Sequence, residues 1–524
     1  MKKYQDNDGQ GRGFLHRCVM PMLLLLTALA AGCGGSADTT NGTGSTSAVS
    51  IKHNSPADIT NVSDADYNNN VSGLITGATL KRWKDDWLNQ RPAGITGKLV
   101  ILEVTTGETG YAYIAPPAGS LNVVSYLAAS AEWVMTRSNG VISTPSLVLD
   151  GPSIDAELNK YGIDPANDMI VIAQGTANSG NVMSQGRTWL ALHYWGVDAK
   201  HLAILSGSNQ WQFTSGAMTA VDFATAGNTA PGLPAGTYSV KNLHNDNTSL
   251  IAPVGDFMAV VPATDKSMKG SGMFLWDART MTQYSAGYMR EANDGASAGC
   301  GTAAYCNSAL TYDYMGSFQN NGSRQGHPNG AVDLNFLNML DNCNPAVAPI
   351  VGGGCTYKTK AQLASYMNGE ADAAGNGLHH GNMVNGVYTD TLVGAGNGYQ
   401  PGDTAYVYCE TTFRAMITGM ASAVVLGHPT RFYDGAMIEW NSLSNLPDAT
   451  GNDILPANSP WRTDVKSFFR AASSAALVAT RQITNAYAPN SNVLIAADRA
   501  YKTPAASNTS AAGGGAAPAN PCGG

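Results

Sequence analysis

The stretch that decides the fold runs from residue 404 to residue 415 and reads TAYVYCETTFRA. Its first five residues are β-branched, aromatic or alanine, which is typical of a short buried strand. Further on, Ile417, Met420, Ala421 and Val424 follow the i, i+3, i+4, i+7 spacing of an amphipathic helix. A six-residue loop that begins at Cys409 therefore joins a strand directly to a helix.

Cys409 stands where an anion is physically favoured. The first turn of a helix presents unpaired N–H groups at the positive end of the helix dipole. We therefore expect the Cys409 thiol to be partly thiolate at neutral pH and to act as a nucleophile. The alternative is a buried structural cysteine at the end of a strand, because free cysteine is among the most buried residue types.

Composition and charge indicate a secreted or surface protein of two to four domains. The chain has 524 residues, of which 13% are charged, whereas about 25% is usual for a soluble domain. The net charge is −8 and no basic run is present. Since phosphates require clustered Lys and Arg, a nucleic-acid partner is not expected.

The N-terminus resembles a bacterial lipoprotein signal. A long basic region precedes the apolar run 20–31, which is too short to span a membrane. The run ends in LAAGC, residues 29–33, which resembles the lipobox whose cysteine, here Cys33, receives lipid. The resemblance implies a lipid anchor in the bacterial cell envelope, and the Gly-Gly after Cys33 favours the outer membrane, on either face. The alternative is an ordinary secretory signal cleaved nearby.

The cysteines fall into pairs, with one exception. In an oxidising compartment, close pairs predict two local disulfides, although sequence alone leaves their connectivity open. The predicted disulfides join Cys300 to Cys306 and Cys343 to Cys355. The remaining cysteines lie in the signal or in the Gly/Ala/Pro tail, except Cys409. A lone cysteine inside a folded region is expected of a reactive thiol.

Strand and helix patterns alternate twice along the chain. Buried strands are predicted at 98–104, 169–173 and 202–205, and again at 273–277 and 405–408, so we expect an α/β fold with mainly parallel sheets covered by helices. A loose match between the two halves predicts an internal duplication. The predicted divisions are a signal peptide 1–33, a flexible linker 34–70, a first domain 71–240, a second domain 241–445, a C-terminal helical extension 446–502 and a disordered tail 503–524.

Several motifs occur in an order that resembles the tandem-domain rhodanese family, the thiosulfate/3-mercaptopyruvate sulfurtransferases. Residues 277–279 (DAR) resemble the family's Asp-x-Arg, and residues 326–334 (GHPNGAVDL) resemble its Gly-His-Ile-Pro-Gly-Ala-Val-Asn-Leu. Residues 433–440 (YDGAMIEW) resemble the signature of the tandem enzymes. Cys409 falls where the family's persulfide-forming cysteine lies. The resemblance covers about residues 75–445.

The resemblance implies two tandem rhodanese-like domains, each with a mainly parallel sheet flanked by helices. The loop after Ala173 has no cysteine, so the first domain is expected to be inactive and the second catalytic. Cys409 would take sulfur from a small sulfur-containing anion, form a persulfide and pass the sulfur to a thiol acceptor. The residues expected to bind substrate are Arg279, Glu410, Thr411, Thr412, Phe413 and Arg414. For Arg279 the resemblance also implies a structural role that ties loops together with Asp277, and the alternative for Arg414 is to cap loop carbonyls. Asp277 and His327 are expected to support the surrounding loops.

The active-site loop departs from the family pattern. Thiosulfate enzymes carry cations and a glycine where this chain has Glu410, Thr411 and Thr412, and a further arginine where it has Gln283. A carboxylate beside the thiol opposes its ionisation and repels a dianionic donor. Activity on thiosulfate is therefore doubtful, although a different sulfur or selenium donor is compatible with the loop. The second hypothesis is a catalytically weak rhodanese-fold subunit of an outer-membrane assembly.

No cofactor or metal is expected. The pair His379-His380 has no carboxylate beside it in sequence, which makes a weak metal site. Insertions at about 290–325 and 341–400 carry the predicted disulfides and would form a lid or a face for a protein partner. A helix predicted at 461–487 would pack on the sulfurtransferase core, the alternative being an interaction helix.

Overall fold

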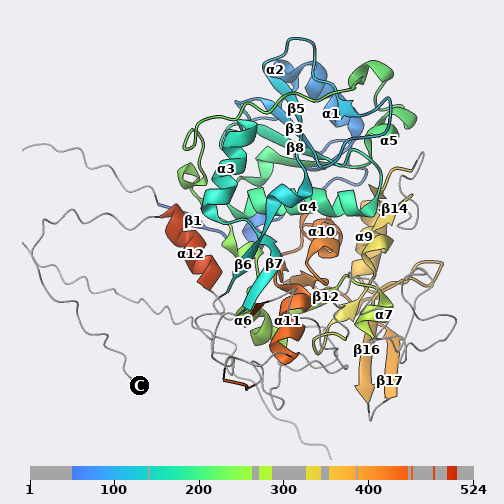
Figure 1. The fold of residues 1–524 in the computed structure, drawn as a ribbon. Coiled ribbons are helices and arrows are strands. Elements are labelled where there is room, and N and C mark those ends of the chain that lie inside the picture. The colour runs from blue at the N-terminus through green and yellow to red at the C-terminus, as the bar shows by residue number, and fades with distance from the viewer. Residues whose placement is uncertain are drawn as a thin grey trace, which may run out of the picture. The chain divides into compact units, whose positions relative to one another are not determined.

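The computed structural model describes residues 50–139, 142–261, 271–285, 326–343, 353–384, 387–445, 450–452, 476–477 and 493–503. Two lobes, each with its own central sheet, follow one another along the chain (Figure 1). Of the predicted helix 461–487 the structure describes only Ala476–Leu477, which form a strand paired antiparallel with Ile142 and Ser143, so the helix prediction is wrong at these two residues. The pair Cys300 and Cys306 lies outside the described residues. None of the described helices combines the length and apolar character needed to cross a bilayer.

The first lobe is built on a five-stranded sheet in which each strand is parallel to its neighbours, in the order β2-β9-β8-β3-β5. Its central strands are buried along their whole length because helices cover both faces, which explains their continuous Val, Ile and Leu runs. The strands are β2 (Gly73–Ile75), β3 (Leu99–Glu103), β5 (Val123–Leu127), β8 (Met169–Ala173) and β9 (Leu202–Leu205). The helices are α1 (Gly77–Asp85), α2 (Trp87–Gln90), α3 (Gly151–Tyr161), α4 (Ser179–Tyr194) and α5 (Asn209–Thr214).

The second lobe has a six-stranded sheet, in the order β17-β16-β13-β12-β18-β19. The four core strands are parallel, and an antiparallel hairpin extends the sheet at one edge. The strands are β12 (Met273–Asp277), β13 (Val332–Asp333), β16 (His379–Val384), β17 (Val387–Leu392), β18 (Thr404–Tyr408) and β19 (Thr430–Phe432). The helices are α6 (Val254–Val260), α7 (Met281–Tyr284), α9 (Lys360–Met367), α10 (Phe413–Met420), its π-helical continuation η10 (Ala421–Leu426) and α11 (Ala436–Asn445).

The two sheets repeat one strand order. If the five strands of the first sheet are numbered along the chain, their order across the sheet is first, fifth, fourth, second, third. In the second lobe Ile251 forms a parallel bridge with Phe432, so this residue takes the place of the first strand beside β19, β18, β12 and β13. The predicted fold class, two tandem mainly parallel sheets flanked by helices, is confirmed.

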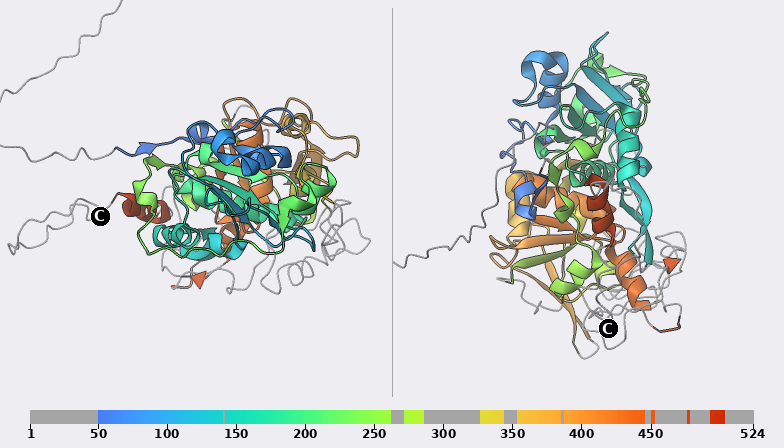
Figure 2. Two further views of the ribbon diagram at one scale, coloured as in Figure 1. Left: turned by 90° about the horizontal axis from the view of Figure 1, so that it is seen from above. Right: turned by 90° about the vertical axis from the view of Figure 1, so that its left-hand side faces the viewer.

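Helices α4 and α10 hold the two lobes together. A Cβ atom on Gly186 of α4 would lie 2.4 Å from Cβ of Met416 on α10, so only glycine permits this approach. A hairpin of the first lobe, β6 (Val134–Ser138) and β7 (Ile142–Val148), also reaches the start of α11, as Figures 1 and 2 show. There, Val148 N donates to Asp434 Oδ2 over 2.7 Å.

Residues 50–70 correct one expectation, because they are not a flexible linker. Strand β1 (Lys52–His53) pairs in parallel with β11 (Asn245–Asp246). Asn61 N and Ser63 N donate to Ala423 O and Val425 O, at 2.8 and 3.0 Å. The last carbonyls of a helix lack donor partners inside it, so these N-terminal residues, which we call the strap, supply donors to the end of η10.

The described C-terminal helix, α12 (Val493–Lys502), packs on the first lobe beside α3 (Figure 2). Arg137 binds Asp498 through two hydrogen bonds, of 3.0 and 2.7 Å, and the Tyr194 hydroxyl donates to the same carboxylate. The remaining strands are β4 (Tyr113–Ile114), β10 (Phe223–Ala224), β14 (Leu340–Asp341), β15 (Thr356–Tyr357) and β20 (Ala476–Leu477).

Candidate active site

Cys409 lies at the predicted junction, directly after β18 and four residues before α10 begins at Phe413. Its thiol is free of disulfide bonds. Its main chain is fixed by the start of α11, where Met437 N donates to Cys409 O and Ile438 N donates to Glu410 O, both over 3.1 Å. Only 1% of Cys409 is exposed. This burial agrees with the alternative interpretation, in which Cys409 is a structural cysteine at the end of a strand.

The loop after the thiol presents backbone donors. Among the described residues, none accepts a hydrogen bond from the backbone N–H of Thr411, Thr412 or Phe413. These groups belong to the loop and first turn that lead into α10, where unpaired donors and the helix dipole favour an anion. The arrangement suits a negatively charged sulfur attached to Cys409.

Thr412 gives the loop its turn. It adopts φ of 64°, the left-handed region, in which a β-branched residue is strained. Its hydroxyl lies 2.9 Å from Tyr433 O and 3.0 Å from Asp434 O, so it donates to the segment just before α11. The side chain thus holds in place a conformation that the main chain alone would disfavour.

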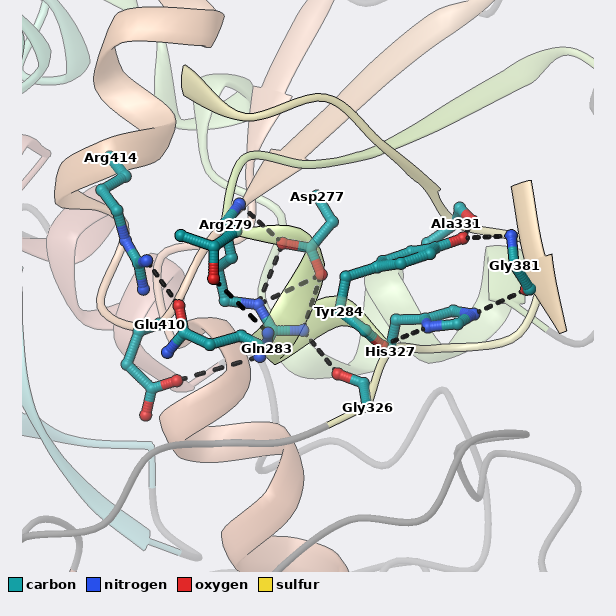
Figure 3. A network of polar contacts seen from close by, with 11 residues as sticks. Asp277, Arg279, Gln283, Tyr284, Gly326, His327, Ala331, Gly381, Glu410 and Arg414 are labelled. Carbon is teal, nitrogen blue, oxygen red and sulfur yellow. Dashed lines mark hydrogen bonds and ion pairs between the residues drawn. The ribbon is translucent and has the colours of Figure 1, made fainter. Parts of the chain in front are cut away.

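A buried charge network lies behind the loop (Figure 3). Arg279 binds Asp277 through Nε and Nη2, the shortest contact being 2.6 Å, and Nη2 also donates to Gly326 O. The Glu410 carboxylate lies 3.9 Å from Arg279 Nη1. Burial disfavours the charged form of Arg279, but the Asp277 carboxylate outweighs it and raises the pKa of the guanidinium above its ordinary value.

This network favours the structural role of Arg279 and changes the role expected of Glu410. Arg279 has no exposed surface, and it binds Asp277 and a loop carbonyl, so its geometry is that of a structural residue beside Asp277. Glu410 is 1% exposed and directs its carboxylate towards Arg279. Its charge is therefore partly compensated by Arg279 and does not stand alone beside the thiol.

The other predicted residues lie around this network. Arg414 is partly exposed, and its Nη1 donates to Gln283 Oε1 over 2.5 Å. Gln283 is neutral, so this contact orients the guanidinium without neutralising its charge. His327 stacks on Tyr284 with ring centroids 3.8 Å apart, and its two ring nitrogens lie 2.8 Å from Tyr284 O and 3.1 Å from Gly381 O. It joins the end of α7 to β16, as loop support would.

The insertion of the second lobe closes the corresponding place in the first. Gln174 follows β8 as Cys409 follows β18, and Gln174 Nε2 lies 3.2 Å from Gly354 O and 3.3 Å from Cys355 O. Ser208 N also donates to Gly354 O, over 3.1 Å. We call residues 353–357 the plug. The predicted disulfide between Cys343 and Cys355 is present and ties the plug to β14.

A buried carboxyl lies beside the plugged site. Glu103 ends β3 as Asp277 ends β12, but it binds Ile114 N and Asn209 Nδ2, at 2.6 and 2.7 Å, in place of an arginine. Burial raises the pKa of Glu103 to about 8, against these two hydrogen bonds. The carboxyl is therefore largely neutral at pH 7.

Two features of the site escaped sequence reasoning. His379 does have a carboxylate neighbour, because its Nδ1 lies 2.9 Å from Asp390 Oδ2 across the hairpin, yet the described residues hold no cluster of three metal-ligating side chains. Arg187 of α4 lies 2.6 Å from Asp434 Oδ1 at the edge of the Cys409 loop. Arg187 lies in the stretch GRTW, residues 186–189, which is a weak signal in sequence because its partner Asp434 is 247 positions away.

No family model matches the chain, and neither does the sequence of a curated protein. Among solved structures it is similar to Tum1 of Saccharomyces cerevisiae, with 12% identity, coverage of 76% of this chain and 99% of that chain, and a TM-score of 0.43. SseA of Escherichia coli, a rhodanese-fold 3-mercaptopyruvate enzyme, is 13% identical, and the match covers 70% of this chain and 98% of that chain with a TM-score of 0.40. EanB, solved as a persulfide with ergothioneine, is 11% identical, and the match covers 72% of this chain and 70% of that chain with a TM-score of 0.42. At such identities and scores the likeness carries no argument about activity.

Proposed function

We propose that this chain is a sulfurtransferase that carries sulfane sulfur as a persulfide on Cys409. The observation that carries the proposal is the free thiol at a strand–helix junction, next to the open N–H groups of Thr411, Thr412 and Phe413. A buried structural cysteine needs no such donors, whereas an anionic persulfide does.

The reaction would proceed in two displacements. The Cys409 thiolate attacks the outer sulfur of the donor, a new S–S bond forms, and the donor's own bond to that sulfur breaks with its electron pair leaving on the rest of the donor. An acceptor thiolate then attacks the outer sulfur of the persulfide. The Cys409 thiolate departs as the leaving group, so the enzyme is regenerated without an external oxidant or reductant.

Charge around the thiol selects the donor. The buried network holds two carboxylates, Asp277 and Glu410, against the one guanidinium of Arg279. A dianion such as thiosulfate is disfavoured there, and a donor of lower charge is favoured. Arg414 at the outer side of the loop would receive a single anionic group of the substrate or of the acceptor. Because Cys409 is 1% exposed, the donor reaches the sulfur only when neighbouring side chains move, which makes turnover slow.

The test is intact mass spectrometry of the purified protein after incubation with thiosulfate, mercaptopyruvate or polysulfide. The expected result is a gain of one sulfur atom from mercaptopyruvate, which carries a single negative charge, with a smaller gain from the dianions thiosulfate and polysulfide, and the added sulfur should be removed again by a small thiol. Cys409→Ser should show no gain, while Cys343→Ser/Cys355→Ser should behave like the wild type at position 409. If no donor produces an adduct that depends on Cys409, the proposal is wrong.

A second function is favoured by two observations, the burial of Cys409 and the plug that closes the first lobe. In this alternative the chain is a catalytically weak subunit that binds a protein partner at the outer membrane. Both candidate functions include a lipid anchor at Cys33. Fractionation of cells that express the full chain should find it with the membranes, and Cys33→Ser should release it. A stable partner that co-purifies with a protein inert to every donor would support the alternative.

A further inference from the structure

The Cys409 loop of the second lobe is held by the segment that precedes and opens α11. Four contacts connect them: the Thr412 hydroxyl with Tyr433 O and Asp434 O, at 2.9 and 3.0 Å, and the main-chain bonds that Cys409 O and Glu410 O accept, both at 3.1 Å. Any displacement of residues 433–438 therefore displaces the thiol and the N–H groups around it.

That segment is in turn held by the first lobe. Arg187 Nη1 lies 2.6 Å from Asp434 Oδ1, and Val148 N donates to Asp434 Oδ2 over 2.7 Å. Arg187 Nη2 donates to Ser146 O of β7 over 2.8 Å. The Arg187 and Asp434 side chains are 0% and 6% exposed, so neither charge has water as a substitute partner.

Arg187 also touches the loop directly. Its guanidinium carbon lies 5.6 Å from the ring centroid of Phe413, the first residue of α10. A guanidinium at this distance from an aromatic ring is attracted to it. One side chain of the first lobe therefore contacts both the anchor of the loop, Asp434, and the residue that ends the loop.

From these contacts we propose that Arg187 is a positioning residue for Cys409, supplied by the lobe that lacks a cysteine of its own. The catalytic consequence rests on the proposed sulfurtransferase function, but the mechanical claim does not. In this view the first lobe is required for the geometry of the site, and the ion pair between Arg187 and Asp434 transmits its position to the loop. The guanidinium is needed because its two ends reach Asp434 and Ser146 at once, which a lysine cannot do.

The matched control is the ion pair between Arg137 and Asp498. It is similarly buried, with side chains 8% and 2% exposed, and Arg137 makes two hydrogen bonds to Asp498 where Arg187 makes one to Asp434. It joins the first lobe to α12 and does not touch the Cys409 loop. Removing either arginine leaves a buried carboxylate unpaired and should lower global stability similarly. Only the loss of Arg187 should act on the Cys409 loop.

The experiment measures hydrogen exchange of the Met437 and Ile438 amides, which donate to Cys409 O and Glu410 O, and the rate of persulfide formation in Arg187→Met, Arg187→Lys and Arg137→Met. We expect Arg187→Met to speed exchange of these amides and to slow persulfide formation by about 10- to 100-fold, Arg187→Lys to have an intermediate effect, and Arg137→Met to leave both near wild type. If Arg187→Met does not fold, Arg187→Lys provides the measurement.

Two outcomes would overturn the proposal: unchanged exchange of the Met437 and Ile438 amides in both Arg187 variants, or an equal increase in Arg137→Met. Exchange is independent of sulfur chemistry. A wild type that takes no sulfur therefore contradicts the proposed function alone, while a change in exchange still supports the positioning role.

Discussion

Gln174 occupies in the first lobe the register position that Cys409 occupies in the second. Glu103 pairs with Ala173 across β3 and β8, and Asp277 pairs with Tyr408 across β12 and β18. The next residue along the chain is Gln174 in one lobe and Cys409 in the other. One strand end thus carries a thiol, whereas its counterpart carries an amide that binds Gly354 O and Cys355 O of the plug.

The plug should depend on its disulfide. Cys343→Ser/Cys355→Ser opens a bridge between residues 12 apart in sequence, which should lower the free energy of unfolding by about 3 kcal/mol. Exchange of the Ser208 amide, which donates to Gly354 O, should accelerate. The neighbouring Asn209 amide donates to Gly175 O within the first lobe and serves as the internal control. Equal acceleration at both positions would show that the plug is not what protects Ser208.

Glu103 should make the protein less stable as pH rises. Burial raises its pKa to about 8 in the folded chain, from an ordinary value of 4.5. Between these values the unfolded chain releases a proton that the folded chain retains, so stability is full below pH 4.5 and falls by up to roughly 5 kcal/mol by pH 8. Urea unfolding at several pH values should show this slope in the wild type.

The matched variants are Glu103→Gln, which keeps a neutral polar group at the site, and Glu370→Gln at an exposed position. Glu103→Gln should flatten the decline in stability between pH 5 and pH 8, and Glu370→Gln should leave it unchanged. Burial also raises the pKa of Glu439, to about 7, so a shallower slope should remain in Glu103→Gln. A slope as steep as that of the wild type would contradict the role of Glu103.

Thr412 combines strain with a stabilising contact, and two substitutions separate them. Thr412→Gly removes the left-handed strain of about 1–2 kcal/mol together with a hydrogen bond of similar worth, so the free energy of unfolding should change by less than about 1 kcal/mol. Thr412→Val keeps the strain and loses the hydroxyl donor, so it should destabilise by about 2 kcal/mol. Denaturant titration of both variants tests this. Equal losses would mean that the positive φ carries no cost here.

Glu410 should set the charge that a reagent meets at Cys409. The probe is the ratio of alkylation rates for anionic iodoacetate and neutral iodoacetamide, read from the intact mass. Glu410→Gln removes one negative charge close to the thiol, so the ratio should rise about tenfold. Glu370→Gln, on the surface, should leave the ratio unchanged. A ratio that is insensitive to Glu410 would indicate that Arg279 already cancels its charge.

Sequence reasoning succeeded where the signal is local. The apolar runs of β3 and β8 are buried on both faces, and a run of this kind admits few other placements. The strand that ends just before Cys409 was predicted and is present, whereas α10 begins at Phe413, inside the six-residue loop predicted to start at Cys409. Cys343 and Cys355 were paired because they are near neighbours in sequence.

It failed where the partner is distant. No pattern near residue 61 or residue 63 predicts that their N–H groups donate to carbonyls of η10, which lie more than 350 positions away in sequence. The same holds for Arg187 with Asp434 and for Gln174 with the plug, since both contacts join different lobes. The role of Glu410 also changed once Arg279, distant in sequence, was found beside it.

The strap that covers η10 determines where the chain can be cut. A fragment starting at residue 71, the boundary that composition favoured, would strip the amide donors from Ala423 O and Val425 O and lose the bond from the Tyr67 hydroxyl to Lys358 O, which measures 2.5 Å. The helix that begins beside Cys409 would then end in bare carbonyls. Recombinant truncations intended for crystallisation or assay should therefore retain every residue from Ile51 onward.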